Sequence, residues 1–86
     1  MDNKKEIQAF IKAFGQKVNY VREQKKCTLD DLEFYSNIDS SDLNKIELGK
    51  SNITMRTLFR LAKALGVHPK ELFDFEMNGE HKGNKK

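Results

Sequence analysis

The sequence predicts a small all-α domain, and three observations lead to this fold class. Nonpolar residues recur with the 3.6-residue period of an α-helix along most of the chain. Polar cap residues, glycines and the one proline divide this periodic pattern into five segments. The alternation of polar and nonpolar residues that marks a half-buried strand does not occur in the sequence. We therefore expect five helices packed around one core.

The first predicted helix is the longest. Asn3 followed by Glu6 predicts its start. Its nonpolar stripe has the spacing i, i+3, i+4, i+7, i+11 and i+14 and consists of Ile7, Phe10, Ile11, Phe14, Val18 and Val21. Gly15 lies within this stripe, where a glycine weakens a helix by roughly 1 kcal/mol relative to alanine. Its presence predicts a kink or a close approach of another segment.

Two short helices are predicted next. Thr28 with Asp31 three residues later is typical of a capping box, so the second helix should begin at Thr28. The stretch SNI at 36–38 interrupts the periodic pattern. Asp39 then offers an N-cap for the third helix, and Gly49 a left-handed C-terminal cap.

The last two predicted helices are marked by the same kinds of signal. Thr54 can cap the fourth helix and Gly66 end it. Pro69 fits the first position of a short fifth helix, with His68 as its N-cap. The nonpolar residues of the fourth helix are Met55, Leu58, Phe59, Leu61, Ala62 and Leu65. We expect residues 1–76 to form the domain and the polar segment 77–86 to be disordered.

Composition narrows the classes of function. A chain of 86 residues leaves little room for an enclosed active site, so we expect no enzyme. Its 16 basic and 13 acidic residues give a net charge of +3, which permits an anionic partner without requiring one. Cys27 is the single cysteine; it fits a core thiol in a reducing cytoplasm. No paired His/Cys spacing predicts a metal or cofactor, and no membrane span or small-molecule ligand is indicated.

The third helix has two different sides. At 100° per residue, Leu43 and Ile46 share the side that packs. The other side gathers Ser41, Asn44, Lys45 and Leu48, with Ser40 at the exposed N-terminal end. Two short helices joined by a tight turn form a helix-turn-helix, whose second helix can enter the DNA major groove. Ser, Asn and Lys can hydrogen-bond base edges there, although a solvated helix surface would have the same composition.

Three longer stretches carry a resemblance to a known family. They read FGQKVNYVREQKKCTLDDL, SNIDSSDLNKIELGK and TLFRLAKALGVHPKELF, and the patterns I-E-x-G-K and L-x-x-L-A-x-A-L-G-V are the strongest marks. The chain resembles the Xre-type helix-turn-helix regulators related to phage Cro and lambda-type repressors. SNID, NIT and the closing FDFE resemble, within that family, the small controller proteins of restriction-modification systems. The resemblance implies a five-helix lambda-repressor-like DNA-binding domain.

The resemblance also implies roles for individual residues. The base-reading positions fall on Ser40, Ser41, Asn44 and Lys45, and the phosphate contacts on Thr28 and Lys50. Glu47 falls at a buried acid that pairs with an arginine of the first helix, here Arg22. The implied function is transcriptional regulation by a cytoplasmic homodimer that reads a short inverted repeat in double-stranded DNA.

Some residues depart from the family pattern. Glu33 replaces a small residue, Asn37 the usual turn glycine, Leu29 a polar contact residue and Ile53 a frequent proline. Residues 28–50 hold six acids and two lysines, a net charge of −4 that would repel phosphates. This charge leaves an alternative open, a protein-interaction module such as the antitoxin of a toxin–antitoxin pair, whose acidic second helix faces a basic protein.

The end of the predicted domain carries more nonpolar side chains than a terminal turn needs. They are Leu72, Phe73, Phe75 and Met77. An exposed cluster of this kind marks an interface, and proteins of the resembled family commonly dimerise there. We therefore expect these four residues to form the homodimer interface.

Overall fold

The computed structural model describes residues 3–76, and within that range the fold is all-α, as predicted. The elements are α1 (Lys4–Gln24), α2 (Leu29–Ser36), α3 (Ser40–Glu47), α4 (Met55–Leu65) and η1 (Pro69–Phe73). The fifth element is a 3₁₀ helix and not an α-helix, so the described chain has four α-helices and one 3₁₀ turn. Met77 and the tail predicted at 77–86 lie outside the described residues.

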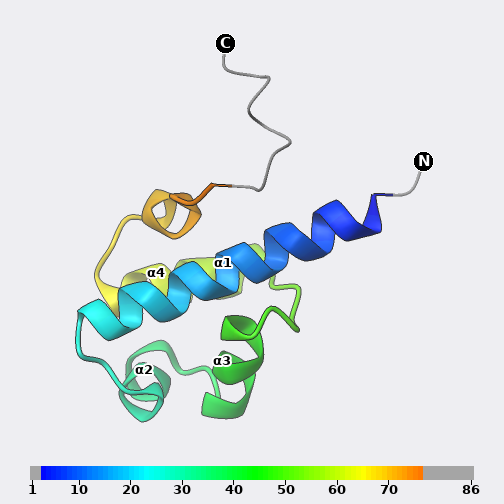
Figure 1. Ribbon diagram of the computed structural model, residues 1–86. Helices are drawn as coiled ribbons and strands as arrows, with labels where there is room; N and C mark the ends of the chain where they lie inside the picture. Colours follow the sequence, from blue (N-terminus) through cyan, green and yellow to red (C-terminus); the bar gives the residue numbers. More distant parts are fainter. Residues whose placement is uncertain (1–2, 77–86) are drawn as a thin grey trace.

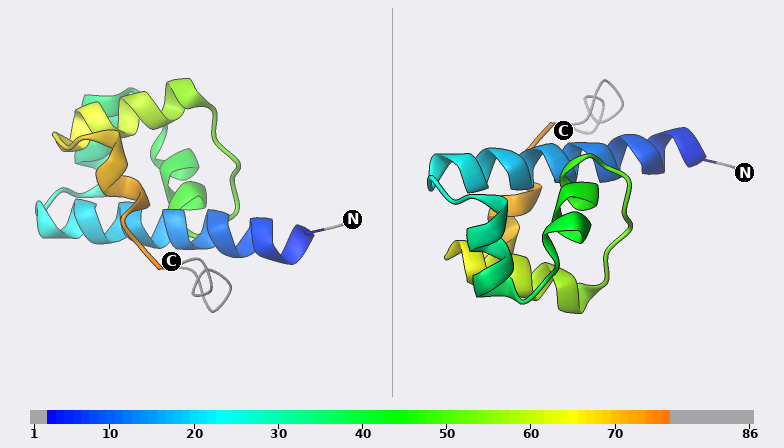
Figure 2. Two further views of the ribbon diagram at one scale, coloured as in Figure 1. Left: turned by 90° about the horizontal axis from the view of Figure 1, so that it is seen from above. Right: turned by 90° about the horizontal axis from the view of Figure 1, so that it is seen from below.

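Helix α1 lies across the whole domain (Figure 1). Helix α4 runs behind it, α2 and α3 lie on one side, and η1 lies on the other. The views in Figure 2 show η1 between α1 and α4 from above, and α2 beside α3 from below. The side chains buried where these elements meet are Phe14, Val18, Val21, Leu32, Leu43, Ile46, Leu58, Leu61, Ala62, Leu65 and Leu72.

The nonpolar stripe of α1 is only partly core. Phe14, Val18 and Val21 are buried, but Ile7 is 51% exposed and Phe10 is 44% exposed. The prediction of one continuous core stripe is wrong at this end, because the first turns of α1 extend past the other helices (Figures 1 and 2). Periodicity shows which side of a helix is nonpolar, but it does not show where its packing partners end.

Local cap signals set most helix boundaries. The Oγ1 of Thr28 accepts a hydrogen bond from the Asp31 amide at 3.0 Å, and the Asp31 carboxylate accepts one from the Thr28 amide at 3.0 Å. This is the predicted capping box. Thr54 caps α4 and His68 caps η1 through their side chains, also as predicted. Asn3 precedes α1 as expected, but its side chain makes no capping hydrogen bond.

Gly15 marks a close approach of two helices and not a kink. Helix α1 continues through it without interruption. A Cβ atom at this position would lie 2.2 Å from the carbonyl oxygen of Ile46 and 2.8 Å from that of Glu47. Glycine therefore lets α1 lie directly against the C-terminal end of α3, and this contact fixes the orientation of α3.

Candidate nucleic-acid interface

The turn between α2 and α3 is built from local hydrogen bonds. Asn37 ends α2 in the left-handed conformation, with φ of 63°, and its amide donates to the Glu33 carbonyl. Asparagine tolerates this conformation better than most residues, so it replaces glycine here at little cost. The hydroxyl of Ser36 accepts a hydrogen bond from the Ile38 amide at 3.1 Å. The two helices are thereby joined by a tight turn, as the sequence predicts.

Glu33 has a role that the sequence does not reveal. Its carboxylate accepts a hydrogen bond from the backbone amide of Ser40 at 3.2 Å, at the first turn of α3. Asp39 occupies the N-cap position, but its side chain makes no capping hydrogen bond, so the prediction that it caps α3 is wrong. The capping group comes from seven residues earlier, on the neighbouring helix, where no local capping pattern would indicate it.

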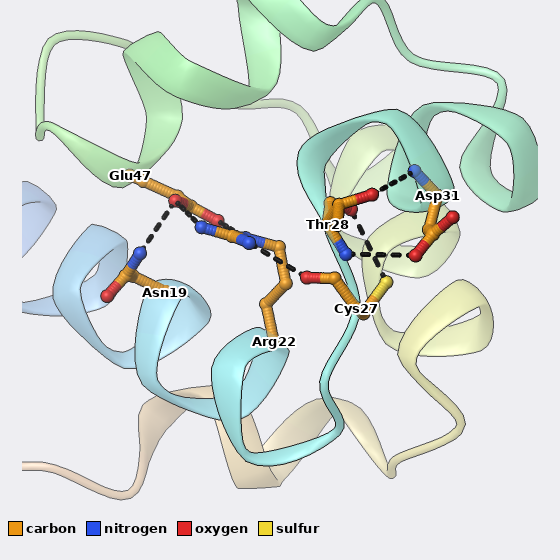
Figure 3. A network of polar contacts seen from close by, with 6 residues as sticks. All are labelled: Asn19, Arg22, Cys27, Thr28, Asp31 and Glu47. Atoms are coloured by element: carbon orange, nitrogen blue, oxygen red, sulfur yellow. Dashed lines mark hydrogen bonds and ion pairs between the residues drawn. The ribbon is translucent and has the colours of Figure 1, made fainter.

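Arg22 of α1 and Glu47 of α3 form a bidentate ion pair (Figure 3). The Nε of Arg22 lies 2.6 Å from Oε2 of Glu47, and its Nη2 donates to Oε1 at 3.0 Å. Asn19 also donates to Oε1, at 2.9 Å, and Arg22 Nη1 donates to the Cys27 carbonyl at 2.8 Å. The hydrogen bond to Glu47 raises the pKa of Arg22. This network joins α1, α3 and the segment that leads into α2.

Asn19 is the member of this network that sequence reasoning missed. It lies three residues before Arg22, so both side chains project from the same side of α1. That spacing is a usable signal once an arginine has been assigned to a buried pair, since each carboxylate oxygen can accept more than one hydrogen bond. With Asn19 and Arg22 as donors, both oxygens of Glu47 are satisfied.

The exposed side of α3 carries the predicted base-reading residues. Ser41, Asn44 and Lys45 are exposed, whereas Ser40 is half-buried. Ser41 and Lys45 project roughly 160° away from the buried Leu43. Asn44 is turned to the side, where it lines a groove between α3 and α1. Ser41 and Lys45 therefore form the centre of the outward face and Asn44 lies at its edge, whereas Ser40, at the first position of α3, projects within about 60° of the buried Leu43.

Thr28 and Lys50 lie at two ends of the motif. Thr28 is exposed, but its hydroxyl and its amide are both engaged in the capping box. Lys50 is exposed and follows Gly49, whose φ of 77° ends the α3 segment in the left-handed conformation, as predicted. A Cβ atom on Gly49 would lie 2.8 Å from the Cα of Lys12, so the chain also passes very close to α1 here.

Hydrogen bonds and an ion pair reduce the effective negative charge of residues 28–50. Three of their six acids are engaged: Asp31 in the capping box, Glu33 at the start of α3, and Glu47 with Arg22. Their charge is therefore partly offset by helix N-termini and by a guanidinium group. The net charge of −4 overstates the repulsion that a phosphate near α3 would meet.

The predicted dimer residues do not share one environment. Leu72 is fully buried and belongs to the core, so its assignment to a surface interface is wrong; the turn of η1 points it inward between α1 and α4. Phe73 is 40% exposed and Phe75 is half-buried. Their rings pack on Phe10, with centroid distances of 6.1 and 5.7 Å. Phe10, Phe73 and Phe75 form an aromatic cluster, of which the sequence predicted only the last two.

Cys27 is half-buried and packs at the margin of the core. Its thiol donates a weak hydrogen bond to the Thr28 carbonyl, with a distance of 3.6 Å. Burial raises the pKa of the thiol, which disfavours the reactive thiolate.

Among residues 3–76, no group of three potential ligands lies close enough to hold a metal ion. No helix within that range is long and nonpolar enough to cross a membrane.

Comparison with known proteins gives results that agree with this geometry. The family described as Helix-turn-helix (HTH_3) matches residues 18–72. The control protein C.BamHI of Bacillus amyloliquefaciens is 36% identical over 67 residues, which cover 77% of this chain and 83% of that protein. The HTH-type transcriptional repressor RghR of Bacillus subtilis (strain 168) is 31% identical over 58 residues, which cover 66% of this chain and 43% of that protein. The crystal structure of the restriction-modification controller protein C.AhdI from Aeromonas hydrophila matches with a TM-score of 0.72 at 33% identity, covering 73% of this chain and 96% of that one.

Proposed function

The chain belongs to the helix-turn-helix family of DNA-binding transcriptional regulators, and we propose that it reads a short inverted repeat in the major groove as a homodimer. The predicted resemblance to Xre-type regulators and to restriction-modification controller proteins is thereby confirmed. These relatives are named as a control protein, a transcriptional repressor and a restriction-modification controller protein, which are names of regulators and not of enzymes.

The observation that carries the proposal is the orientation of α3. The Gly15 contact and the Arg22–Glu47 pair hold its buried side against α1. Its opposite side presents Ser41 and Lys45 to the solvent. Hydroxyl and ammonium groups can bond to base edges, and Lys in particular can reach the acceptors of guanine. Asn44 at the edge of this face and Ser40 at the N-terminal end of α3 complete the proposed set of base contacts.

Thr28 and Lys50 would hold the sugar-phosphate backbone on either side of α3. Contacts to phosphates set the register of the protein on DNA but do not read its sequence. Lys50 offers a positive charge, and Thr28 lies at the N-terminus of α2, where the helix dipole favours an anion. In this proposal the protein acts in the cytoplasm, and a reducing compartment would keep the free thiol of Cys27 reduced.

A nonpolar surface supports the homodimer. A pocket of about 160 Å³ lies between α1, α4 and the aromatic cluster, and its lining includes Phe10, Ile53 and Met55. Met55 is 78% exposed at the first turn of α4. Exposed nonpolar groups gathered around a pocket are typical of a protein interface. In this proposal a second copy of the chain contacts Met55 and the aromatic cluster of Phe10, Phe73 and Phe75. Leu72 packs beneath them in the core.

Selection of bound fragments from random duplex DNA tests the proposal. A dimer presents two copies of α3 about one helical turn apart, so the selected site should be an inverted repeat with half-site centres roughly 10 bp apart. Bending of the duplex would change this spacing slightly. Recovery of fragments that share no inverted repeat would contradict the proposed reading.

A second function is supported by one observation. On α2, Phe34 is 80% exposed and Tyr35 is 67% exposed, with their rings in edge-to-face contact at 5.2 Å. The exposed Asp30 lies on the same short helix. A protein-interaction module, such as the antitoxin of a toxin–antitoxin pair, would use such an acidic aromatic surface. Stoichiometric recovery of a basic protein from the source cell, together with failure to select DNA, would favour this alternative.

A further inference from the structure

A groove of about 400 Å³ runs between α1 and the motif. Lys12, Gln16 and Asn19 of α1 form one wall, and Asn44 of α3 with Leu48, the residue that follows α3, forms the other. Leu29 closes the end at the start of α2, and the Arg22–Glu47 pair lies at the base. The groove therefore lies directly beside the proposed base-reading face and shares Asn44 with it.

The wall on α1 belongs to a longer stripe of hydrogen-bond donors. Lys5, Gln8, Lys12, Gln16 and Asn19 are spaced by three or four residues, so they project from one side of the helix. The Nε2 of Gln8 donates to the Gly49 carbonyl at 3.0 Å, which fixes this side of α1 against the loop after α3. Lys5 lies seven residues before Lys12 and projects within roughly 20° of the same direction. It belongs to the first turn of α1, and the first turns of this helix extend past the other helices (Figure 1).

The charge of this surface differs from that of α2. Glu47 is the only acid among the residues that line the groove, and both of its oxygens are engaged by Arg22 and Asn19. Lys12 is an exposed cation at the groove, and Lys5 and Lys50 continue the positive charge beyond it. An approaching phosphate meets amide and ammonium donors here, with no uncompensated carboxylate among the lining residues.

We propose that this groove and the extended N-terminal turns of α1 form a phosphate-backbone track for the DNA. One strand of the duplex follows Asn44, Gln16 and Lys12 and leaves the domain along Lys5. Leu48, which is 52% exposed, offers a nonpolar wall for the sugar C–H groups. The track lengthens the contact beyond the helix-turn-helix and supplies the positive charge that α2 lacks. This inference rests on the proposed DNA-binding function.

The test uses the full chain and a duplex that carries the selected inverted repeat with flanking sequence. We would measure the dissociation constant between about 50 and 200 mM salt for the wild type, Lys12→Gln and Lys5→Gln. Each lost phosphate contact should make the slope of log K against log salt shallower by about 0.9 per subunit. Between about 50 and 200 mM salt, the loss of affinity of the variant should therefore be smaller than that of the wild type by a factor of about 3.5 per subunit. The order of preference among base sequences should stay that of the wild type, because these residues hold the backbone.

Lys17→Gln is the matched control. Lys17 lies on α1 as well, but it projects about 140° away from Lys12 and packs over the Tyr20 ring at 5.1 Å. It should leave the salt slope unchanged. Gln16→Glu, a substitution at an exposed position, should weaken binding to every duplex because it places a carboxylate in the track. Unchanged thermal unfolding of all four variants would show that they remain folded.

The outcomes separate this inference from the function on which it rests. If the wild type selects no duplex, the proposed function itself fails. If the wild type binds its inverted repeat while Lys5→Gln and Lys12→Gln keep the wild-type slope, the track is refuted and the function stands. Ethylation of individual phosphates gives a second readout. A phosphate whose ethylation prevents binding of the wild type should no longer affect the binding of Lys12→Gln. An interference pattern identical to that of the wild type would contradict the track.

Discussion

Removing the carboxylate of Glu47 should destabilise the whole domain. Its side chain is 6% exposed and that of Arg22 is 11% exposed, so Glu47→Ala leaves a buried guanidinium that has lost its ion pair and two hydrogen bonds. Breaking a buried pair from one side typically costs about 3 to 5 kcal/mol. Arg22 keeps one hydrogen bond to the Cys27 carbonyl, which places the expected loss toward the lower end of that range.

Thermal unfolding followed by circular dichroism measures this loss. For a domain of this size, 1 kcal/mol shifts the melting temperature by about 4 to 8 °C, so a loss near 3 kcal/mol should lower it by roughly 12 to 24 °C. Arg22→Ala should have a similar effect, and the double mutant should lose less than the sum of the two single variants. A loss below about 1 kcal/mol for Glu47→Ala, or strictly additive losses, would refute the argument that the pair orients α3.

Three further predictions concern packing, charge and assembly. Gly15→Ala should lower the free energy of unfolding by about 1 to 3 kcal/mol in urea titrations, because its Cβ would overlap the Ile46 carbonyl; wild-type stability would contradict the close approach. Asp30→Asn should tighten binding to any duplex, more at low than at high salt, if α2 lies near phosphates; unchanged affinity would place α2 away from the DNA. Met55→Glu should raise the dimer dissociation constant at least about tenfold in sedimentation equilibrium, since a charge would replace an exposed nonpolar side chain at the proposed interface. An unchanged dissociation constant would exclude Met55 from that interface.

The helix boundaries could be predicted because their signals are local. Thr28 with Asp31, Thr54, Gly66 and Pro69 each act within one turn of their own position. Such signals can be read from the sequence without any knowledge of the tertiary structure. The all-α class and the order of the elements followed from these signals together with the helical period.

The remaining errors come from contacts between distant residues. The capping of α3 by Glu33 depends on how two helices pack, and the exposure of Phe10 depends on where α4 and η1 end along α1. A leucine such as Leu72 is equally suited to a surface interface and to a core, and here the turn of η1 directs its side chain into the core. The sequence therefore predicts where the elements begin and end better than it predicts which side of an element each residue occupies.

The groove beside α3 depends in the same way on tertiary structure. Lys12 and Gln16 lie far from the motif in sequence, and a long helix with mixed charge gives no reason to assign them to a DNA contact. Gly15 and Gly49 bring α1 and the end of α3 together, and only that close approach places Lys12 beside Asn44. The position of these donors is therefore a product of packing.

The most direct test of the central claim is a comparison of Lys45→Ala with Lys50→Ala on single-base variants of the selected site. Lys45 projects from the centre of the exposed face of α3, whereas Lys50 lies beyond its end. If α3 reads bases, Lys45→Ala should lose about 1 to 3 kcal/mol of discrimination at one base position per half-site and leave the other positions unchanged. Lys50→Ala should weaken all variants alike and make the salt slope shallower by about 1 per subunit. If Lys45→Ala instead weakened every sequence equally, α3 would not be the helix that reads the DNA, and the central claim would be wrong.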